Sequence, residues 1–152
     1  ISSGSDYSGG VNGSSWGGTG TNPNTSLTIA TVALQFIPSV WLLQNNITID
    51  AVQYIMSADA STTANLHVMS YSLVAGSGAT AGDLTSGAVL AQTGSADDSL
   101  SPVTIGADRT SNGTLTINTA DVDSSKAILV FAENVGGTDD ITVQVNIKYH
   151  LR

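Results

Sequence analysis

Hydrophobic and polar residues alternate along this chain in short runs, and the last run is the most regular. Between positions 141 and 151 every second residue is apolar: Ile141, Val143, Val145, Ile147, Tyr149 and Leu151. Polar residues fill the positions between them. Because side chains of a β-strand point alternately to its two sides, this period of two predicts a strand with one apolar face, which we expect to be buried.

Similar patterns predict further strands at intervals of roughly ten residues. The clearest spans residues 47–56, where a change of phase after Ile49 brings Val52, Tyr54 and Met56 to the inward side. The other strands are expected over residues 27–36, 40–43, 64–74, 88–93, 103–105, 114–118 and 127–133, with Asn112-Gly113 as a hairpin turn.

The strands and turns together indicate the fold class. No segment shows the sustained 3.6-residue apolar period of a helix. About eight strands separated by turn signals predict an all-β domain, built as an antiparallel β-sandwich or jelly roll. We expect this domain to span residues 27–152.

The first 26 residues have a different composition, dominated by Gly, Ser, Asn and Thr without a hydrophobic period. Such a segment is typical of a flexible arm or linker. Three large side chains interrupt it: Tyr7, Val11 and Trp16. They are either isolated aromatic and apolar residues of a disordered tail, or anchors that dock the arm on a neighbouring subunit or on its own domain.

The charge of the chain excludes several classes of partner. The formal net charge is −8, and only four residues are Lys or Arg: Arg109, Lys126, Lys148 and Arg152. Binding to nucleic acid or to an anionic membrane surface draws on clusters of basic residues, so we expect neither. No apolar run is long enough to span a bilayer, and the chain has no Cys.

Residue types that carry out chemistry are scarce. The two histidines, His67 and His150, are far apart in the sequence, and each is expected to be an ordinary strand residue. The acidic pairs Asp97-Asp98 and Asp139-Asp140 lack the further ligands of a calcium loop, and Asp is common in turns. Because no group of nucleophile, base and metal-ligand residues converges in the sequence, we expect no catalysis, no metal and no cofactor.

The polar face of the last strand bears on assembly. Thr142, Gln144 and Asn146 are neutral, so this face would not repel a second copy of the chain. Closed homo-oligomers bury matching patches of this kind around a symmetry axis. We therefore expect these three residues, together with Tyr7, Val11 and Trp16, to form subunit contacts.

From residue 47 to the end, the layout of strands and turns resembles the C-terminal β-sandwich domains of bacteriophage virion proteins, especially tail-fibre and other appendage proteins. The segments that carry the resemblance are ITIDAVQYIMS, ANLHVMSYSLV, GATAGDLTSGAVLAQTG, GTLTINTADVDSSKAILVFAEN and DITVQVNIKYHLR. The resemblance implies a domain that forms trimers, caps or decorates the particle, and touches the host surface. The chain departs from it in lacking a shaft repeat, which leaves both a fibre tip and a capsid decoration protein open.

These observations predict a non-enzymatic virion structural protein that forms homotrimers at a phage tail fibre or capsid surface, and so a virion or extracellular location. Its partners would be copies of itself, other virion proteins and host-surface glycans. Two alternatives stay open. One is an extracellular filament or pilus subunit that polymerises by β-strand addition, and the other is a carbohydrate-binding, lectin-like module.

Overall fold

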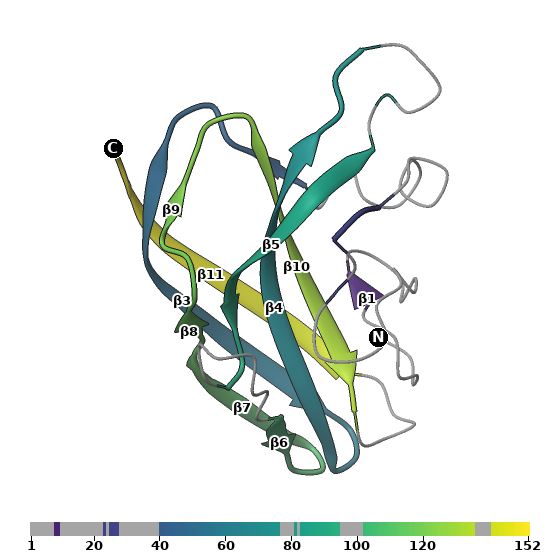
Figure 1. Cartoon of the computed structure of the whole chain (residues 1–152). Coiled ribbons are helices and arrows are strands. Elements are labelled where there is room, and N and C mark those ends of the chain that lie inside the picture. The colour runs from purple at the N-terminus through teal and green to yellow at the C-terminus, as the bar shows by residue number, and fades with distance from the viewer. Residues whose placement is uncertain are drawn as a thin grey trace.

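The structure, a computed structural model, describes residues 8–9, 23, 25–27, 40–76, 81, 83–94, 102–135 and 141–152. In these residues all regular elements are strands, arranged in two antiparallel sheets. The strands of one sheet cross those of the other to form a β-sandwich (Figure 1). The predicted all-β sandwich is therefore confirmed.

The larger sheet, sheet A, has three long strands in the order β10, β4 and β5. These span Lys126–Asn134, Thr62–Leu73 and Leu84–Gln92, respectively. Four short strands complete the sheet: β1 (Ser8–Gly9) and β2 (Trp41–Leu42) beside β10, β6 (Val103–Ile105) beside β4, and β8 (Thr116–Ile117) beside β5. These short pairings raise the number of strands in the described chain to eleven, above the predicted eight or so.

The smaller sheet, sheet B, is built around β3 (Ile47–Ala58). On one side β3 pairs along its length with β11 (Ile141–Leu151), whose bounds agree with the sequence prediction. On the other side it pairs with β7 (Arg109–Thr114) and β9 (Asp121–Val122). Since β3 is the only described strand that pairs with β11, β11 forms one edge of sheet B.

The main core lies between the sheets, and β3 and β4 contribute half of its buried residues. Val52, Tyr54 and Met56 on β3 face Leu66 and Val68 on β4 in this core. A β-bulge at Asp50, opposite Lys148 and Tyr149, produces the predicted change of phase along β3. Bulges of this kind let one long strand keep its apolar side chains on one face while its direction bends.

A second apolar cluster covers the outer side of sheet A. It contains Met69, Tyr71, Phe131 and Leu84, together with Leu27 from the N-terminal part of the chain. Leu27 and Leu84 exchange two backbone hydrogen bonds of 2.7 and 2.9 Å. Because this cluster covers one side of β4 and the main core covers the other, β4 is buried on both faces.

Two expectations about local structure are wrong. Asn112-Gly113 lies within strand β7, opposite Ile55 and Tyr54, instead of forming a hairpin turn. The glycine is needed for packing there, since a Cβ at Gly113 would lie 2.7 Å from the Tyr54 hydroxyl oxygen. The apolar face of β11 is also not fully buried, because Tyr149 and Leu151 are 44% and 63% exposed at its C-terminal end.

Part of the N-terminal segment lies against sheet A. Ser8–Gly9 pairs with Phe131 and Ala132, and the Thr25 carbonyl accepts a 2.8 Å hydrogen bond from the Gly87 N–H. The predicted boundary between an arm and a domain at residue 26 stays a prediction.

Candidate interaction surface

The outer side of sheet B carries a flat array of uncharged side chains. In the register of the sheet, Gln144 on β11 lies opposite Ile55 on β3, which lies opposite Asn112 on β7. Parallel rows lie on either side of this one. We call the nine residues of the three rows the neutral face: Thr142, Ser57 and Thr110; Gln144, Ile55 and Asn112; Asn146, Gln53 and Thr114.

Alternation along each strand generates this face. On β3 the residues between Gln53, Ile55 and Ser57 are Tyr54 and Met56, whose burial in the main core fixes the opposite side chains toward solvent. Seven of the nine side chains are hydroxyl or amide groups on exposed positions, with Ser57 half-buried and Ile55 the single large apolar member. Ile55 is 47% exposed at the centre of the array.

The absence of charge on this face is notable in a chain of net charge −8. The nearest charged residues in the register lie beyond its two ends, with Arg109 opposite Ala58 and Lys148 opposite Ala51. Uncharged groups cost much less to remove from water than charged ones, and they do not repel an identical surface. The neutral face is therefore well suited to contact another protein surface.

A shallow hollow of about 490 Å³ lies at one end of the neutral face. Its lining combines all three residues of the face's end row with Ala58 and a cluster of one basic and two acidic residues: Ser57, Ala58, Asp59, Asp108, Arg109, Thr110 and Thr142. Charged side chains thus gather at this end of the face and leave its centre neutral.

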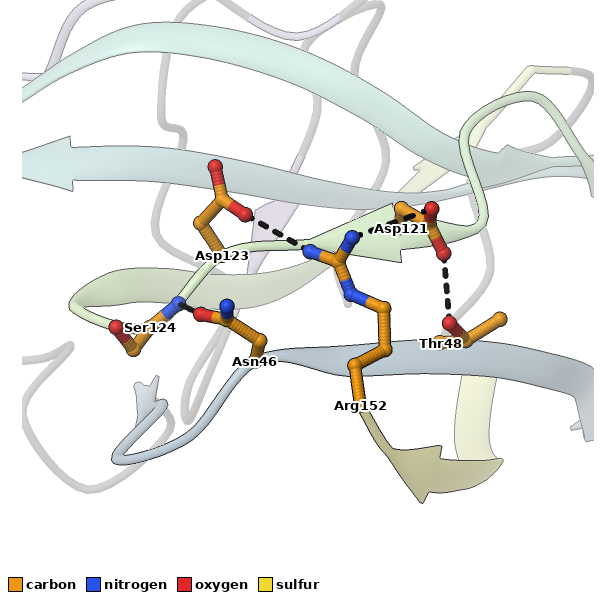
Figure 2. Close-up of polar contacts among 6 residues, drawn as sticks. All are labelled: Asn46, Thr48, Asp121, Asp123, Ser124 and Arg152. Atoms are coloured by element: carbon orange, nitrogen blue, oxygen red, sulfur yellow. Dashed lines mark hydrogen bonds and ion pairs between the residues drawn. The ribbon is translucent and has the colours of Figure 1, made fainter.

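The opposite end of sheet B is held by a polar latch at the C-terminal residue (Figure 2). The Arg152 guanidinium lies between two carboxylates, at 3.3 Å from Asp121 and 2.8 Å from Asp123. Asp121 also accepts a 2.6 Å hydrogen bond from the Thr48 hydroxyl. The Asn46 carbonyl accepts a 3.0 Å bond from the Arg152 N–H, so the end of β11 is tied to both β3 and β9.

The two histidines occupy different environments. His150 Nδ1 lies 2.9 Å from Asp50 on the exposed side of the β3 bulge. The sequence alone does not indicate this pair, because the two residues are brought together only by the register of β3 and β11. His67, in contrast, is completely buried on β4, where it lies opposite Phe131 and Gln92.

Around His67 the outer side of sheet A holds a buried polar network. Asn65 donates a 3.0 Å hydrogen bond to the Glu133 carboxylate, and Thr93 donates a 3.4 Å bond to the Asn65 side-chain oxygen. The same Thr93 oxygen accepts a 3.1 Å bond from the Leu66 N–H. These contacts join β4, β10 and the end of β5, so the network stabilises the pairing of these strands.

One titratable group of the described chain, the Tyr71 phenol, has a clearly shifted pKa. Burial raises the pKa of Tyr71 well above its ordinary value of 10.0, which keeps this phenol neutral. In the part of the chain that the structure describes, His, Asp and Glu do not gather in a group of three that could hold a metal ion. The described residues also contain no helix with the length and hydrophobicity needed to cross a bilayer.

The predicted contact residues fall into two sets. Thr142, Gln144 and Asn146 are exposed on one face as expected, and the structure adds six neighbours from β3 and β7 to them. Tyr7, Val11 and Trp16 lie outside the described residues. The six added residues could not be found from the sequence, because nothing in it shows which strands lie beside β11.

Comparisons with known proteins return no relative. Neither the family models, nor the curated proteins, nor the solved structures contain a match to this chain.

Proposed function

We propose that this protein is a non-enzymatic structural subunit of a virion, which assembles with copies of itself at a phage tail fibre or capsid surface. The neutral face is the observation that carries the proposal. It places nine uncharged side chains, with the exposed Ile55 at their centre, on one side of a sheet in a protein of net charge −8. That the assembly is a virion follows only from the resemblance of residues 47–152 to phage appendage domains.

The physical argument concerns the cost of bringing copies together. A surface that carried a proportionate share of the twelve acidic residues would repel its own copy, and burying those carboxylates would cost several kcal/mol for each charge. The neutral face avoids both penalties. Hydroxyl and amide groups can exchange hydrogen bonds with the same groups on another copy, and burial of Ile55 adds a hydrophobic contribution of about 1 kcal/mol.

The proposed oligomer is a trimer, as in the phage domains that the chain resembles. A trimer would place one neutral face of each subunit near the symmetry axis and leave the remaining surface for other virion proteins. Contact with host-surface glycans would then occur away from the neutral face.

The test is the mass of the purified chain in solution, measured by sedimentation equilibrium and native mass spectrometry. We expect a multiple of three copies of the 15.4 kDa chain. Ile55→Lys places a charge at the centre of the neutral face and should reduce this mass. Thr104→Lys, at an exposed position on β6 in the other sheet, is the matched control and should not change it. A wild-type chain that remains monomeric at micromolar concentration would refute the proposal.

A further inference from the structure

The backbone of β11 presents a row of hydrogen-bonding groups, at the edge of sheet B, that no other strand among the described residues pairs. The direction of these groups follows from β3. The Val52 carbonyl accepts a 2.8 Å hydrogen bond from Leu115, so Val52 points its backbone groups away from β11. Successive residues of a strand alternate in this direction, and Gln53, Ile55 and Ser57 therefore point toward β11.

The register then determines which residues of β11 bond to β3. Asn146, Gln144 and Thr142 lie opposite Gln53, Ile55 and Ser57, so these even-numbered residues form the ladder. The bond from the Arg152 N–H to the Asn46 carbonyl follows the same parity. Consequently Val143, Val145 and Ile147 point their N–H and C=O groups outward, where no other described strand lies beside them.

The sequence of residues 141–147 lacks the charged, Pro and Gly residues by which sheet proteins prevent unwanted pairing at an edge. Residues 141–147, with the sequence ITVQVNI, contain no charge, no Pro and no Gly, and five of the seven are β-branched. A charged residue and a bulge appear only afterwards, at Lys148 and between Lys148 and Tyr149. Short segments of this composition pair readily with another strand, and natural edges of this kind are normally protected or occupied.

The inward side chains of the same residues are also incompletely covered. Val143, Val145 and Ile147 pack against the main core but remain half-exposed, and Tyr149 and Leu151 beyond them are exposed. A strand added at this edge would cover these side chains while it paired the outward backbone groups. Backbone and side chains thus both favour an additional strand at the same place.

We propose that this strand is β11 of a second copy, paired antiparallel about a two-fold axis at Val145. In this register Val145 lies opposite its own counterpart, and Val143 lies opposite Ile147 of the second copy. All outward N–H and C=O groups of these three residues then find partners, in six hydrogen bonds that only an odd-to-odd pairing allows. Each subunit supplies the same surface, as a two-fold interface requires.

Electrostatics permit this pairing. Lys148 of each copy lies opposite Thr142 of the other, so the two lysines are about 20 Å apart at 3.4 Å per residue. That separation exceeds the Debye length at physiological salt, and their repulsion is screened. Gln144 lies opposite Asn146 of the second copy, and the two neutral faces join into one continuous surface.

The inference rests on the proposed self-assembly but uses a different surface, so the two can fail separately. Ile55→Lys disables the neutral face and leaves the β11 edge intact, and this variant should be a dimer. Val145→Pro removes an outward N–H and keeps the ladder to β3, so it should weaken edge pairing about tenfold or more and leave the face-mediated trimer. Val145→Thr, which keeps the N–H and the β-branch, is the matched control and should assemble like the wild type.

Cysteine cross-linking tests the register directly, because the chain has no Cys of its own. Gln144 and Asn146 of opposite copies form a non-hydrogen-bonded pair with Cα atoms about 4.5 Å apart, within disulfide range. A Gln144→Cys, Asn146→Cys double variant should therefore form a covalent dimer under mild oxidation. Either single variant should not, because identical positions of the two copies are about 7–8 Å apart, diagonally across the pair.

These measurements separate the possible outcomes. An unchanged mass for Val145→Pro together with no cross-link in the double variant would overturn the edge proposal and leave the neutral face untouched. Cross-linking of a single variant would overturn the register. Loss of assembly in Val145→Pro without any cross-link would show that a strand other than β11 occupies the edge, which also overturns the proposal. If Ile55→Lys keeps the wild-type mass while the double variant cross-links, the neutral-face function fails and the edge pairing stands.

Discussion

Replacement of Gly113 by alanine tests whether this glycine serves packing or a turn. Gly113 lies directly opposite Tyr54 in the β3–β7 pair, and the Tyr54 ring leans across it. A Cβ on residue 113 would lie 2.7 Å from the Tyr54 hydroxyl oxygen, 3.0 Å from Cζ and 3.1 Å from Cε1. The new methyl group can be accommodated only if the ring moves, and the ring is 8% exposed in the main core.

The magnitude follows from two opposing effects. Overpacking a well-filled core costs about 1–3 kcal/mol. Replacing glycine by alanine in an ordinary strand conformation returns about 0.4–1 kcal/mol, because the unfolded chain loses freedom. We expect Gly113→Ala to lower the free energy of unfolding by about 1–2 kcal/mol, which corresponds to a drop in Tm of about 3–6 °C for a chain of this size.

Thermal and urea denaturation, followed by circular dichroism, would measure this loss. Asn112→Ala is the control, since the neighbouring Asn112 is exposed on the neutral face and its loss should change stability by less than about 0.5 kcal/mol. Tyr54→Phe removes the nearest clashing atom, so in the Gly113→Ala background it should show a favourable coupling of about 0.5 kcal/mol or more. A Gly113→Ala variant as stable as the wild type would refute the packing argument. Equal losses of stability for Asn112→Ala and Gly113→Ala would instead favour a turn at these two residues.

Two further predictions concern the C-terminal latch and the buried phenol. Arg152→Ala should lower the free energy of unfolding by about 1 kcal/mol at low salt and by less at 1 M salt, because the ion pairs of Arg152 with Asp121 and Asp123 are exposed and therefore screened. Urea denaturation at both salt concentrations measures this loss. A loss that does not depend on salt would contradict the prediction. Burial raises the pKa of Tyr71 in the folded state, so the folded chain holds that proton more tightly and stability should fall as pH rises above about 10. Tyr71→Phe should reduce the slope of stability against pH in that range, and an unchanged slope would show that Tyr71 does not contribute to it.

The elements that the sequence predicted best are those whose pattern is local. The run from Ile141 to Leu151 alternates without interruption, and the strand has those bounds. The change of phase between Ile49 and Val52 is visible in the sequence, and the structure has a β-bulge there. The residues of β11 that lie opposite the bulge cannot be found from the sequence. A hairpin signal at Asn112-Gly113 failed because the same dipeptide fits a strand when a large side chain crosses the glycine, and that side chain, Tyr54, is distant in the sequence.

The residues of the neutral face could likewise be predicted only where their pattern is local to one strand. Thr142, Gln144 and Asn146 were recognised as a neutral row from their own strand, but a row becomes a face only when its neighbours are known. Ile55 and Asn112 complete the middle row through two registers that join three separate parts of the chain. The exposure of Tyr149 and Leu151 does not follow from the alternating pattern for a related reason. Among the described residues β11 has a neighbouring strand on one side only, and its inward side chains are therefore covered less.

The two proposed contacts share one strand and yet can be separated by residue parity. Even-numbered residues of β11 direct their side chains to the neutral face and their backbone to β3. Odd-numbered residues direct their side chains to the core and their backbone to the edge. A side-chain change at Gln144 therefore perturbs the face and spares the edge hydrogen bonds, whereas proline at Val145 perturbs the edge and spares the face. If β11 serves both contacts, the charge-free surface of one subunit extends without a break into that of its partner, and the oligomer would be assembled from paired sheets.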